Sequence, residues 1–536
     1  MLEGVIVDVE LSDVSRLYVR RKNNKEVLRV KFTPHIYVLE RDFYKFEELF
    51  GGTILDTEYE RKPIGISEEK ESLVRIFVRY TDYRKLNKIR NKLSFPIFHL
   101  DIYEEHLSIR IPSLNRVAIE IDENIHGDYL WGLNPDTPEE LRVIMIDKRG
   151  ETWVAKEISG EEIESYESLK ELIDEIDPDI IISEEKINRP GILSINPRSY
   201  REYGIAGMLE KAYFSYAMPR RVIDLTIGNC VESRQERFAL DLGRVLPPKE
   251  NGNVVVGKLK DYLALDAGGI VLTPKPGIYE NVVELDFTGM FPSIILKYNI
   301  SYETCSLHGI LNIKGKAFLP RLIEEPYERR LYFKRLKNEN AKRRASILKL
   351  LLVAAYGYAG KLDNRFGNIY CNFWINKIAR EILIKTIQII KERGSKVIYA
   401  DTDSVFVLHE DNVSDLVQLL HRKTGLPIRI AHKYRKIVFV KGRNNFPVIK
   451  RYFGITINGE LIIKGLMTVH RNAPKVIKKA QIEMMKALLD NNERGIDEIF
   501  TAYRRKILQG QLELEDLTIE IRICLLYTSP SPRDRG

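Results

Sequence analysis

The sequence predicts a multidomain α+β protein, and three observations lead to this. The chain has 536 residues, which is too many for one hydrophobic core. Its hydrophobic content of 44% and charged content of 30% are typical of folded globular proteins and exclude a chain that is disordered throughout. Predicted strands and helices interleave without strict strand–helix–strand alternation, which indicates an α+β fold.

Charge and cysteine content narrow the class of protein. The net charge of +8, from 84 Lys+Arg against 76 Asp+Glu, excludes a histone-like chain but permits local basic grooves. Cys230, Cys305, Cys371 and Cys524 form no CxxC pair, so we expect no zinc cluster, iron–sulfur site or disulfide framework. No apolar run reaches the roughly 18 residues of a membrane span, and the N-terminus is acidic where a signal peptide is basic. We expect a cytoplasmic protein with no membrane partner.

The first 200 residues predict two small segments of mixed strand and helix. In residues 1–112 we expect strands at 5–7, 27–30 and 35–38. From residue 116 to about 199 we expect strands at 141–146 and 179–182 and a helix over 161–175.

Residues 279–409 carry the most informative pattern. The expected elements are a strand at 282–287, a turn at 291–293 leading into a helix, helices 328–337 and 342–356, a long helix over about 372–393, and strands 396–399 and 405–408 around the turn 401–404. Polar residues 338–340 separate the two middle helices, and Gly394 is suited to end the long one.

Three carboxylates stand where these strands end. Asp286 ends one strand, and Asp401 and Asp403 lie at the tip of the hairpin. Residues i and i+2 share a face of a strand, so both hairpin acids can point toward Asp286. Converging carboxylates suit Mg²⁺, and two such ions about 4 Å apart stabilise phosphoryl transfer. The alternative is that Asp-Thr-Asp-Ser is ordinary turn chemistry, which is the commoner meaning of that motif in isolation.

Three short sequence motifs follow one another along the chain. Residues 286–295 read DFTGMFPSII, residues 349–357 read KLLLVAAYG and residues 399–404 read YADTDS. They resemble the palm motif DFxSLYPSII, the fingers motif KxxxNSxYG and the motif YxDTDS of family B DNA polymerases, the last without a mismatch. The segment 464–471 resembles the entry to the thumb. The resemblance extends over nearly the whole chain and is most specific over 279–475. Some archaeal branches of the family, which keep an intact palm and have lost the exonuclease, look similar.

The resemblance implies a right-hand polymerase with palm, fingers and a partial thumb, preceded by an N-terminal domain and a degenerate RNase H-like exonuclease domain. The expected segments are 1–112 (N-terminal domain), 113–205 (degenerate exonuclease-like domain), 206–322 (N-terminal-domain return and first part of the palm), 323–370 (fingers), 371–466 (second part of the palm), 467–523 (partial thumb) and 524–536. The last segment resembles translated sequencing-adapter read-through and is excluded from fold reasoning. We therefore expect a truncated thumb and a missing C-terminal tail, through which a sliding clamp would bind.

The resemblance also implies roles at the metal and nucleotide. Asp286 and Asp403, with the Phe287 carbonyl, would hold two Mg²⁺ ions, and Asp401 would be a less strictly required acid. The nucleotide-binding residues would be Phe291, Arg330, Lys334, Lys349 and Tyr356. Lys349 would meet the triphosphate, and Phe291 would block a ribose 2′-OH, so that dNTPs are the expected substrates. The choice of Arg330 and Lys334 stays open, because Arg329, Arg335 and Lys337 compete with them in register.

Primer–template DNA would contact two further elements. Lys450, Arg451 and Tyr452 are similar to the KxY element that grips primer–template. Gly268 and Gly269 are similar to the end of the YxGG element, although its Tyr is Asp266 here.

The chain departs from the family pattern at several positions. Val353 and Ala354 replace Asn and Ser of the fingers motif, and Gly289 replaces Ser of the palm motif. These changes remove polar contacts near the nucleotide and put affinity and fidelity in doubt more than chemistry.

The proofreading segment is more altered. Residues 117–120, VAIE, resemble the exonuclease motif FDIE with Ala118 in place of Asp, and the second motif ends at Pro190 without its Asp. Too few residues follow for the third motif, so we expect a domain that cannot cut DNA. The acids Glu120, Asp122, Glu184 and Glu185 could form a rearranged metal site, but solvated surface acids are the favoured interpretation.

The sequence thus predicts a monomeric, template-directed DNA polymerase that extends a primer 3′-OH with dNTPs through two Mg²⁺ ions and lacks 3′–5′ proofreading. Repair or translesion synthesis is its expected niche. One alternative is a catalytically weak paralogue that acts as a primer–template-binding scaffold. A nuclease that uses the same acids is disfavoured, because Lys349 and Phe291 would have no role in it.

Overall fold

The computed structural model divides into two compact units. Unit 1 consists of Met1–Asp266 and Ile295–Ile375, and unit 2 of Ala267–Ile294 and Asn376–Gly536. The residues that the structure describes are 4–10, 12, 14–21, 24–31, 33–65, 67, 69–100, 117–118, 128–131, 142–157, 162–189, 192–216, 222, 225–249, 268–361, 364–408, 412–442, 446–470 and 472–519. The seven segments expected from the sequence divide the chain more finely, and their boundaries stay predictions.

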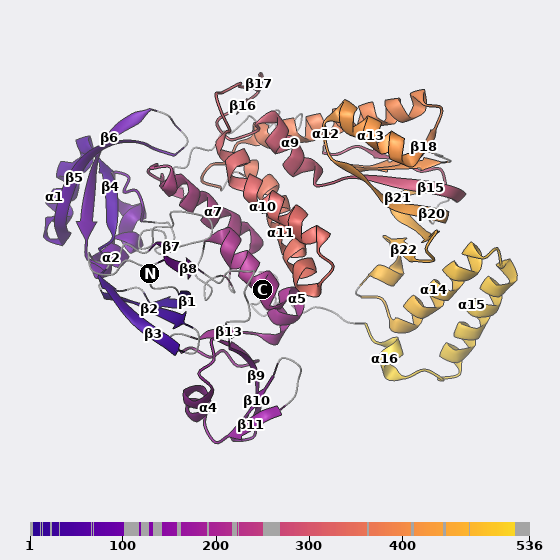
Figure 1. The fold of residues 1–536 in the computed structure, drawn as a ribbon, viewed down its shortest axis with the longest axis horizontal. Coiled ribbons are helices and arrows are strands. Elements are labelled where there is room, and N and C mark those ends of the chain that lie inside the picture. Colours follow the sequence, from indigo (N-terminus) through magenta and orange to yellow (C-terminus); the bar gives the residue numbers. More distant parts are fainter. Residues whose placement is uncertain are drawn as a thin grey trace, which may run out of the picture. The chain divides into compact units, whose positions relative to one another are not determined.

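Unit 1 begins with a five-stranded sheet of order β3-β2-β1-β8-β7 (Figure 1). Its strands are β1 (Gly4–Glu10), β2 (Val14–Arg21), β3 (Asn24–Lys31), β7 (Val117–Ala118) and β8 (Asp128–Trp131). β1 pairs in parallel with β8, and the other neighbours are antiparallel. The strands predicted at 5–7 and 27–30 are confirmed as parts of β1 and β3.

The second sheet of unit 1, β4-β6-β5, has one apolar face. It consists of β4 (His35–Leu39), β5 (Ile54–Pro63) and β6 (Lys70–Val78), which confirms the strand predicted at 35–38. Alternate residues such as Ile36, Val38 and Ile76 pack against α1 (Phe43–Phe50) and α2 (Tyr80–Ile89), because a strand directs every second side chain to the same side. The short 3-10 turns here are η1 (Glu40–Asp42), η2 (Gly51–Thr53) and η3 (Arg90–Lys92).

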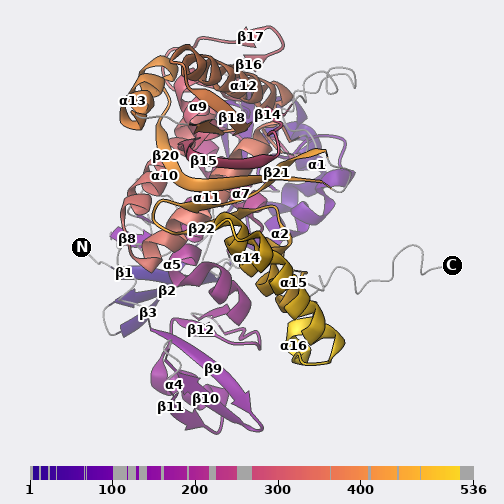
Figure 2. The same ribbon diagram turned by 90° about the vertical axis from the view of Figure 1, so that its right-hand side faces the viewer.

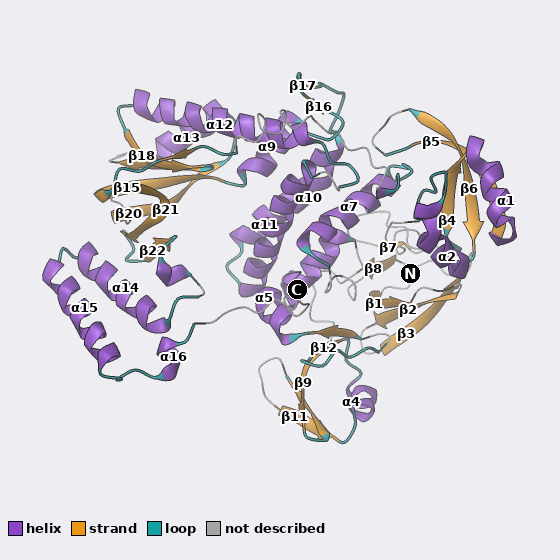
Figure 3. Cartoon of the chain, turned by 180° about the vertical axis from the view of Figure 1, so that it is seen from behind, coloured by secondary structure: helices purple, strands orange, loops and turns teal. Residues whose placement is uncertain are grey.

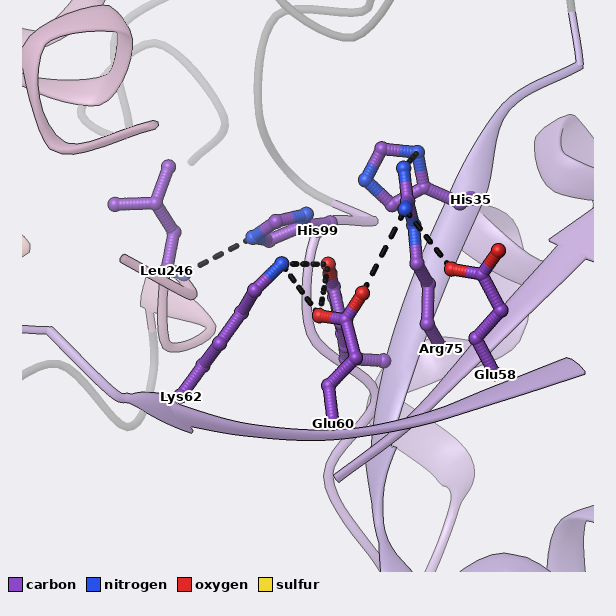
Figure 4. A network of polar contacts seen from close by, with 8 residues as sticks. His35, Glu58, Glu60, Lys62, Arg75, His99 and Leu246 are labelled. Carbon is purple, nitrogen blue, oxygen red and sulfur yellow. Dashed lines mark hydrogen bonds and ion pairs between the residues drawn. The ribbon is translucent and has the colours of Figure 1, made fainter. Parts of the chain in front are cut away.

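The opposite face of this sheet carries a cluster of ion pairs (Figure 4). The Arg75 guanidinium lies 3.1 Å from a Glu58 carboxylate oxygen and 3.6 Å from Glu60. Lys62 pairs with the same Glu60 carboxylate. Two acids and two bases therefore balance one another on the sheet surface.

Two histidines, the buried His99 and the half-buried His35, border this cluster (Figure 4). His99 is 2% exposed, and its Nε2 accepts the Leu246 N–H at 3.1 Å. The His35 ring lies 5.8 Å from the His99 ring, centroid to centroid. Burial, aided by the charges of Arg75 and Lys62, lowers the pKa of His35 to about 3. Burial also lowers the pKa of His99 well below its usual value, so both imidazoles are neutral at pH 7.

A third sheet in unit 1 has the order β11-β10-β9-β12-β13. Its elements are β9 (Val143–Arg149), β10 (Thr152–Lys156), β11 (Glu162–Tyr166), β12 (Ile180–Ile182) and β13 (Leu193–Ile195), with α4 (Leu169–Ile176) between β11 and β12. The strands predicted at 141–146 and 179–182 are confirmed. The helix predicted over 161–175 is wrong in its first half, because residues 162–166 pair antiparallel with β10. The helix starts only after Ser168, whose side chain accepts the Glu171 N–H and caps it.

The rest of unit 1 is largely helical. Its elements are α5 (Pro197–Ser215), α7 (Ile227–Asp241), α10 (Phe318–Arg335), α11 (Glu339–Ala359) and the small hairpin of β16 (Cys305–Ser306) and β17 (Gly309–Ile310). Helices α5, α7, α10 and α11 lie side by side (Figure 3). The helices predicted at 328–337 and 342–356 are confirmed as parts of α10 and α11. Asn338 separates them by capping α11, its side chain accepting the Ala341 N–H at 2.7 Å.

Unit 2 is built on an antiparallel sheet of order β14-β18-β19-β15-β20-β21-β22. Its strands are β14 (Val271–Leu272), β15 (Gly277–Phe287), β18 (Lys396–Asp401), β19 (Ser404–Leu408), β20 (Ile428–Lys441), β21 (Pro447–Thr456) and β22 (Leu461–Lys464). The predicted strands 282–287, 396–399 and 405–408 are confirmed. β20 and β21 are the long strands at the centre of Figure 2.

The two faces of this sheet differ in what covers them. Helices α12 (Ile369–Glu392) and α13 (Val413–Thr424) lie over one face (Figures 1 and 3). Alternation along β15 turns the buried Val283, Leu285 and Phe287 to the side opposite Val282. The predicted long helix at 372–393 is confirmed as part of α12, and Gly394, with φ of 85°, follows its end. The other face carries a buried cluster of Val282, Tyr399, Phe406, Tyr434, Ile437, Phe439 and Tyr452. Alternation places Glu284 and Asp286 on this second face with Val282.

The last described part of unit 2 is helical. It consists of α14 (Lys475–Leu489), α15 (Glu493–Leu508) and α16 (Leu514–Leu517), after the 3-10 turn η6 (Met467–Val469) (Figure 2). Met485 and Leu489 of α14 pack on Val438 and Phe453 of the sheet. The buried Lys436 donates to the Leu489 carbonyl at 2.8 Å, and its positive charge is stabilised there by the negative C-terminal end of the α14 dipole.

No helix among the described residues is long and apolar enough to cross a membrane. Cys230, Cys305 and Cys371 are buried free thiols, and Cys524 lies outside the described residues.

Candidate active site

The sheet of unit 2 aligns two of the three predicted acids in one row. Asp401 faces Ser404 across β18 and β19, Ser404 faces Asp286 on β15, and Asp286 faces Arg429 on β20. Asp286 and Asp401 are therefore two strand spacings apart, or about 10 Å between Cα atoms. Directly paired residues share a face, so both carboxylates lie on the side of the sheet that α12 and α13 leave open.

The backbone of Asp403 lies closer to the end of β15 than the backbone of Asp401 does. The Phe287 N–H donates to the Asp403 carbonyl at 2.9 Å, which joins the end of β15 to the tip of the hairpin. The structure thus brings together Asp286, Phe287 and Asp403, the three residues that the sequence assigned to metal binding. Asp401 stands on the far side of Ser404, and its expected lesser role stays a prediction.

The hairpin tip has a residue in the left-handed conformation, which packs against Gly269. Thr402 has φ of 52°, and its N–H donates to the Ile270 carbonyl at 2.9 Å. A Cβ on Gly269 would stand 3.0 Å from Thr402 Oγ1, so any larger residue would press on this side chain. The Gly268 carbonyl accepts from Arg380 at 2.6 Å. Gly269 therefore packs against the Asp401–Ser404 turn and Gly268 is tied to α12, while the predicted contact of both glycines with DNA stays a prediction.

Lys450 approaches the same turn from β21. Its Nζ lies 3.3 Å from Asp401 Oδ1, and its N–H donates to the Tyr399 hydroxyl at 3.1 Å. The Tyr399 hydroxyl in turn lies 3.4 Å from Asp401 Oδ2. Burial, with the negative charge of Asp401 nearby, raises the pKa of Tyr399 to about 12, so this hydroxyl stays protonated and can donate to the carboxylate. The predicted DNA-contact and catalytic elements meet at Asp401.

Arg451 and Tyr452 are placed differently from each other. Arg451 is exposed, whereas Tyr452 is 6% exposed and packs against Phe406 and Phe439. Burial raises the pKa of Tyr452, whose ring supports the strand that carries Lys450 and Arg451.

Two residues near Asp286 escaped the sequence analysis. Glu284 is buried, and its Oε2 accepts from the Tyr434 hydroxyl at 2.8 Å; burial raises its pKa. Period-2 alternation already puts Glu284 and Asp286 on one face, so this acid could have been found. Arg429, whose guanidinium lies 2.9 Å from Asp286 Oδ2, left no such signal, because its register against β15 is a tertiary fact.

Phe291 stands just beyond the row. It lies half-buried in the first turn of α9 (Met290–Tyr298), so the predicted turn at 291–293 is already helical. Gly289, two residues before Phe291, has φ of 60°, a conformation that favours glycine over the serine of the family motif. The Ser293 hydroxyl donates to the Thr288 carbonyl at 3.3 Å and fixes the start of the helix.

The acids offer the oxygen donors that Mg²⁺ prefers, namely carboxylates with a main-chain carbonyl beside them. Among the described residues, however, no three acidic, histidine or cysteine side chains gather closely enough to hold a metal unaided. The chemistry of the donors fits the ion, and substrate oxygens would have to complete its coordination.

Comparison with known proteins decides the family. The family model described as DNA polymerase family B matches residues 243–314 and 308–531, more than half of the chain. The chain belongs to DNA polymerase family B. The expected family resemblance is therefore confirmed.

Several archaeal polymerases are similar to this family B chain. DNA polymerase 2 of Saccharolobus solfataricus is 32% identical over 321 residues, which cover 57% of this chain and 49% of that protein. DNA polymerase 2 of Aeropyrum pernix is 28% identical over 328 residues, covering 56% and 39%. The chain therefore spans about half or less of the length of these curated relatives.

A solved structure shares the fold. The family B DNA polymerase from the hyperthermophilic archaeon Pyrobaculum calidifontis superposes with a TM-score of 0.68 at 18% identity, covering 98% of this chain and 90% of that one. The multidomain α+β architecture of a family B polymerase is thus confirmed.

The predicted nucleotide-binding side chains of the fingers motif lie in unit 1. Lys349 is exposed on α11, and Val353, one turn later, is 52% exposed, so this helix has an open face that Tyr356 borders. On α10, Arg330 is half-buried and Lys334 exposed. Their competitor Arg329 forms a two-bond ion pair with the buried Glu210, at 2.8 and 2.9 Å, and so serves the helix packing instead.

The exonuclease-like segment of this family B chain is described only in part. Ala118 lies in β7, and Glu120, Asp122 and Pro190 lie outside the described residues. Glu184 and Glu185 are exposed, and Glu185 lies 3.8 Å from Lys148. This placement favours the interpretation of these two as solvated surface acids.

Proposed function

We propose that this chain carries the catalytic centre of a template-directed DNA polymerase, which joins a primer 3′-OH to the α-phosphate of a dNTP. The observation that supports this best is the junction of Asp286 with the hairpin acid Asp403, closed by the hydrogen bond from the Phe287 N–H. Family membership supports the same reaction class.

Asp286 and Asp403, with the Phe287 carbonyl, would hold two Mg²⁺ ions, which when bound supply charge stabilisation for the attacking and leaving oxygens. The other residues of this chain bind and orient. Lys349 meets the triphosphate, with Arg330 and Lys334 adding positive charge. Phe291 excludes a ribose 2′-OH by its bulk. Catalysis then rests on positioning and electrostatics.

Primer–template DNA binds through phosphate contacts of Lys450 and Arg451. Lys450 is exposed at the edge of the row, and phosphate contacts of this kind position DNA without reading its sequence. The buried ring of Tyr452 holds the strand that carries these two residues, and Gly268 and Gly269, next to the Asp401–Ser404 turn, are part of the same proposed DNA-binding surface.

The proposed polymerase acts as a monomer without 3′–5′ proofreading and works on damaged or distorted templates. Ala118 in place of a metal-binding acid and the exposure of Glu184 and Glu185 support the loss of proofreading. The open face around Val353, which lacks the polar groups of the family motif, supports tolerance of distorted base pairs. Clamp binding through a C-terminal tail is part of the same proposal.

A primer-extension assay with and without Mg²⁺ tests the proposal. Metal-dependent, template-directed extension by the wild type that Asp403→Asn abolishes is the expected result. Tight binding of primer–template with no extension at any metal concentration would instead favour the scaffold alternative, which the pairing of Asp286 and Asp401 with basic side chains also supports.

A further inference from the structure

Arg429 stands at the end of the row that contains the two acids. It pairs with Asp286 across β15 and β20, and its Nη2 lies 2.9 Å from Asp286 Oδ2. The side chains are 49% and 24% exposed, so the contact opens to solvent. No other ion pair of Arg429 is found in the part of the chain that the structure describes.

The charge of the row is thereby largely balanced. Asp286 faces Arg429 at one end, and Asp401 faces Lys450 at 3.3 Å at the other. Each divalent ion brings two positive charges, so a cationic side chain already paired with a ligand carboxylate opposes its binding. The guanidinium occupies an oxygen of Asp286 that a metal ion would use.

Arg429 has little to do as a structural residue. An ion pair this exposed contributes little to folding, and its loss leaves no buried charge behind. The buried ion pair of Arg329 with Glu210 in unit 1 shows the contrasting case, in which the acid is fully buried. Arg429 can therefore leave Asp286 at small cost.

We propose that Arg429 is a built-in counter-ion of the metal site, which holds Asp286 while the metal is absent and must be displaced for the metal to bind. The inference rests on the proposed function, because it takes Asp286 as a metal ligand. It predicts that the wild-type chain binds divalent ions more weakly than its acids alone would allow, and that the penalty belongs to this one side chain.

Direct binding of Mn²⁺ to the full chain, by calorimetry or by the electron paramagnetic resonance signal of free Mn²⁺, is the measurement. Arg429→Gln should tighten binding roughly ten-fold, because even at the dielectric of water a nearby unit charge repels a divalent ion by about that factor. Arg429→Lys, which keeps the charge, should stay near wild type. Primer extension should reach half its maximal rate at a correspondingly lower metal concentration in Arg429→Gln.

Arg435→Gln is the matched control. Arg435 is on the same strand, 61% exposed and 3.9 Å from Asp490. It lies six residues further on, about 20 Å away. The same charge change there should leave Mn²⁺ affinity unaltered.

Two results distinguish a failure of the counter-ion role from a failure of the metal site itself. If Asp286→Asn weakens Mn²⁺ binding but Arg429→Gln leaves it unchanged or weaker, the counter-ion role is overturned and the metal site stands. If Asp286→Asn and Asp403→Asn both leave Mn²⁺ binding unchanged, the metal site fails, and the proposed function and this inference fall together.

Discussion

Gly465 lies so close to Lys450 that a Cβ on Gly465 would stand 2.1 Å from the Lys450 carbonyl oxygen. Lys450 itself has φ of 59° and Gly465 φ of 63°. Two residues in left-handed conformations thus join β21 to the end of β22, where Lys450 reaches Asp401. The position of the lysine depends on the absence of a side chain fifteen residues later.

Replacing Gly465 with alanine should therefore displace Lys450. Gly459→Ala is the control, because Gly459 has φ of 81° but nothing within 4 Å of its Cβ position. The control should lose about 1 kcal/mol of unfolding free energy from backbone strain alone. Gly465→Ala should lose about 1–3 kcal/mol more from the clash and should weaken primer–template binding several-fold. Equal melting temperatures and DNA affinities for the two variants would contradict this coupling.

The three acids Asp286, Asp401 and Asp403 should differ in how strictly they are needed. Asp286→Asn or Asp403→Asn should abolish extension while DNA binding stays within a few-fold of wild type, since each change removes a metal ligand and no phosphate contact. Asp401→Asn should be milder, because Asp401 stands one strand further away. Steady-state extension rates and filter binding measure the two effects. Robust primer extension by Asp403→Asn would rule out the proposed metal site.

Phe291 should select the sugar by its shape. Phe291→Ala should admit ribonucleotides much more readily while dNTP use falls modestly, because bulk and not a hydrogen bond discriminates. The ratio of kcat/KM for rNTP to that for dNTP is the measurement. An unchanged ratio in a folded, active variant would remove Phe291 from the nucleotide site.

Lys349 should act on both nucleotide types alike. Its replacement by alanine removes one charge-assisted contact to the triphosphate, worth about 1.5–3 kcal/mol, or roughly 10- to 150-fold in kcat/KM. Lys342→Ala on the same helix is the control, since Lys342 is also exposed and pairs only loosely with Glu339 at 3.8 Å. A loss confined to one sugar type, or shared by the control, would argue against a triphosphate contact.

The chain should show no 3′–5′ exonuclease activity. Two-metal hydrolysis needs converging carboxylates, and Ala118 and Pro190 stand at two of those positions. A primer with a mismatched 3′ end, incubated with Mg²⁺ and without dNTPs, should keep its length. Shortening that survives Asp403→Asn would reveal a separate cutting site in residues 113–205.

Two neutral histidines, His35 in β4 and the neighbouring His99, should make the stability of the protein fall in acid. The folded pKa values of His35, at about 3, and of His99 lie below the ordinary 6.5. Between about pH 6.5 and 3 the unfolded chain therefore binds more protons, so the free energy of unfolding drops as pH falls, by up to about 1.4 kcal/mol per pH unit for each histidine.

Unfolding midpoints measured from pH 7 to pH 4.5 test this. His99→Asn removes one titrating group and should flatten the pH dependence by about one proton. Asparagine is the chosen replacement because it tolerates the φ of 68° at this position. His308→Gln, at an exposed histidine, should leave the pH dependence unchanged. A wild-type midpoint that is constant over this range would refute the burial argument.

Local pattern predicted many elements but failed where partners override it. Residues 161–175 suggested a helix, yet Glu162–Tyr166 forms β11 because Trp153 and its neighbours offer an open strand edge. Helix α7 carries Glu232, Arg234 and Glu236 in its buried middle, which no amphipathic pattern predicts. Their charges are tolerated because Arg234 meets Glu325 and Glu236 meets Arg365, both far away in the chain.

At the candidate site, the sequence by itself determined the residues with chemistry. The alternation over 282–287 and the turn residues of Asp401–Ser404 dictate a strand end and a hairpin tip, because both depend on nearest neighbours along the chain. Only the tertiary structure decided which side chains meet there. Arg429 faces Asp286 and Lys450 faces Asp401 because β20 and β21 add to the sheet in one register, set by packing between strands more than 100 residues apart in the case of β15 and β20.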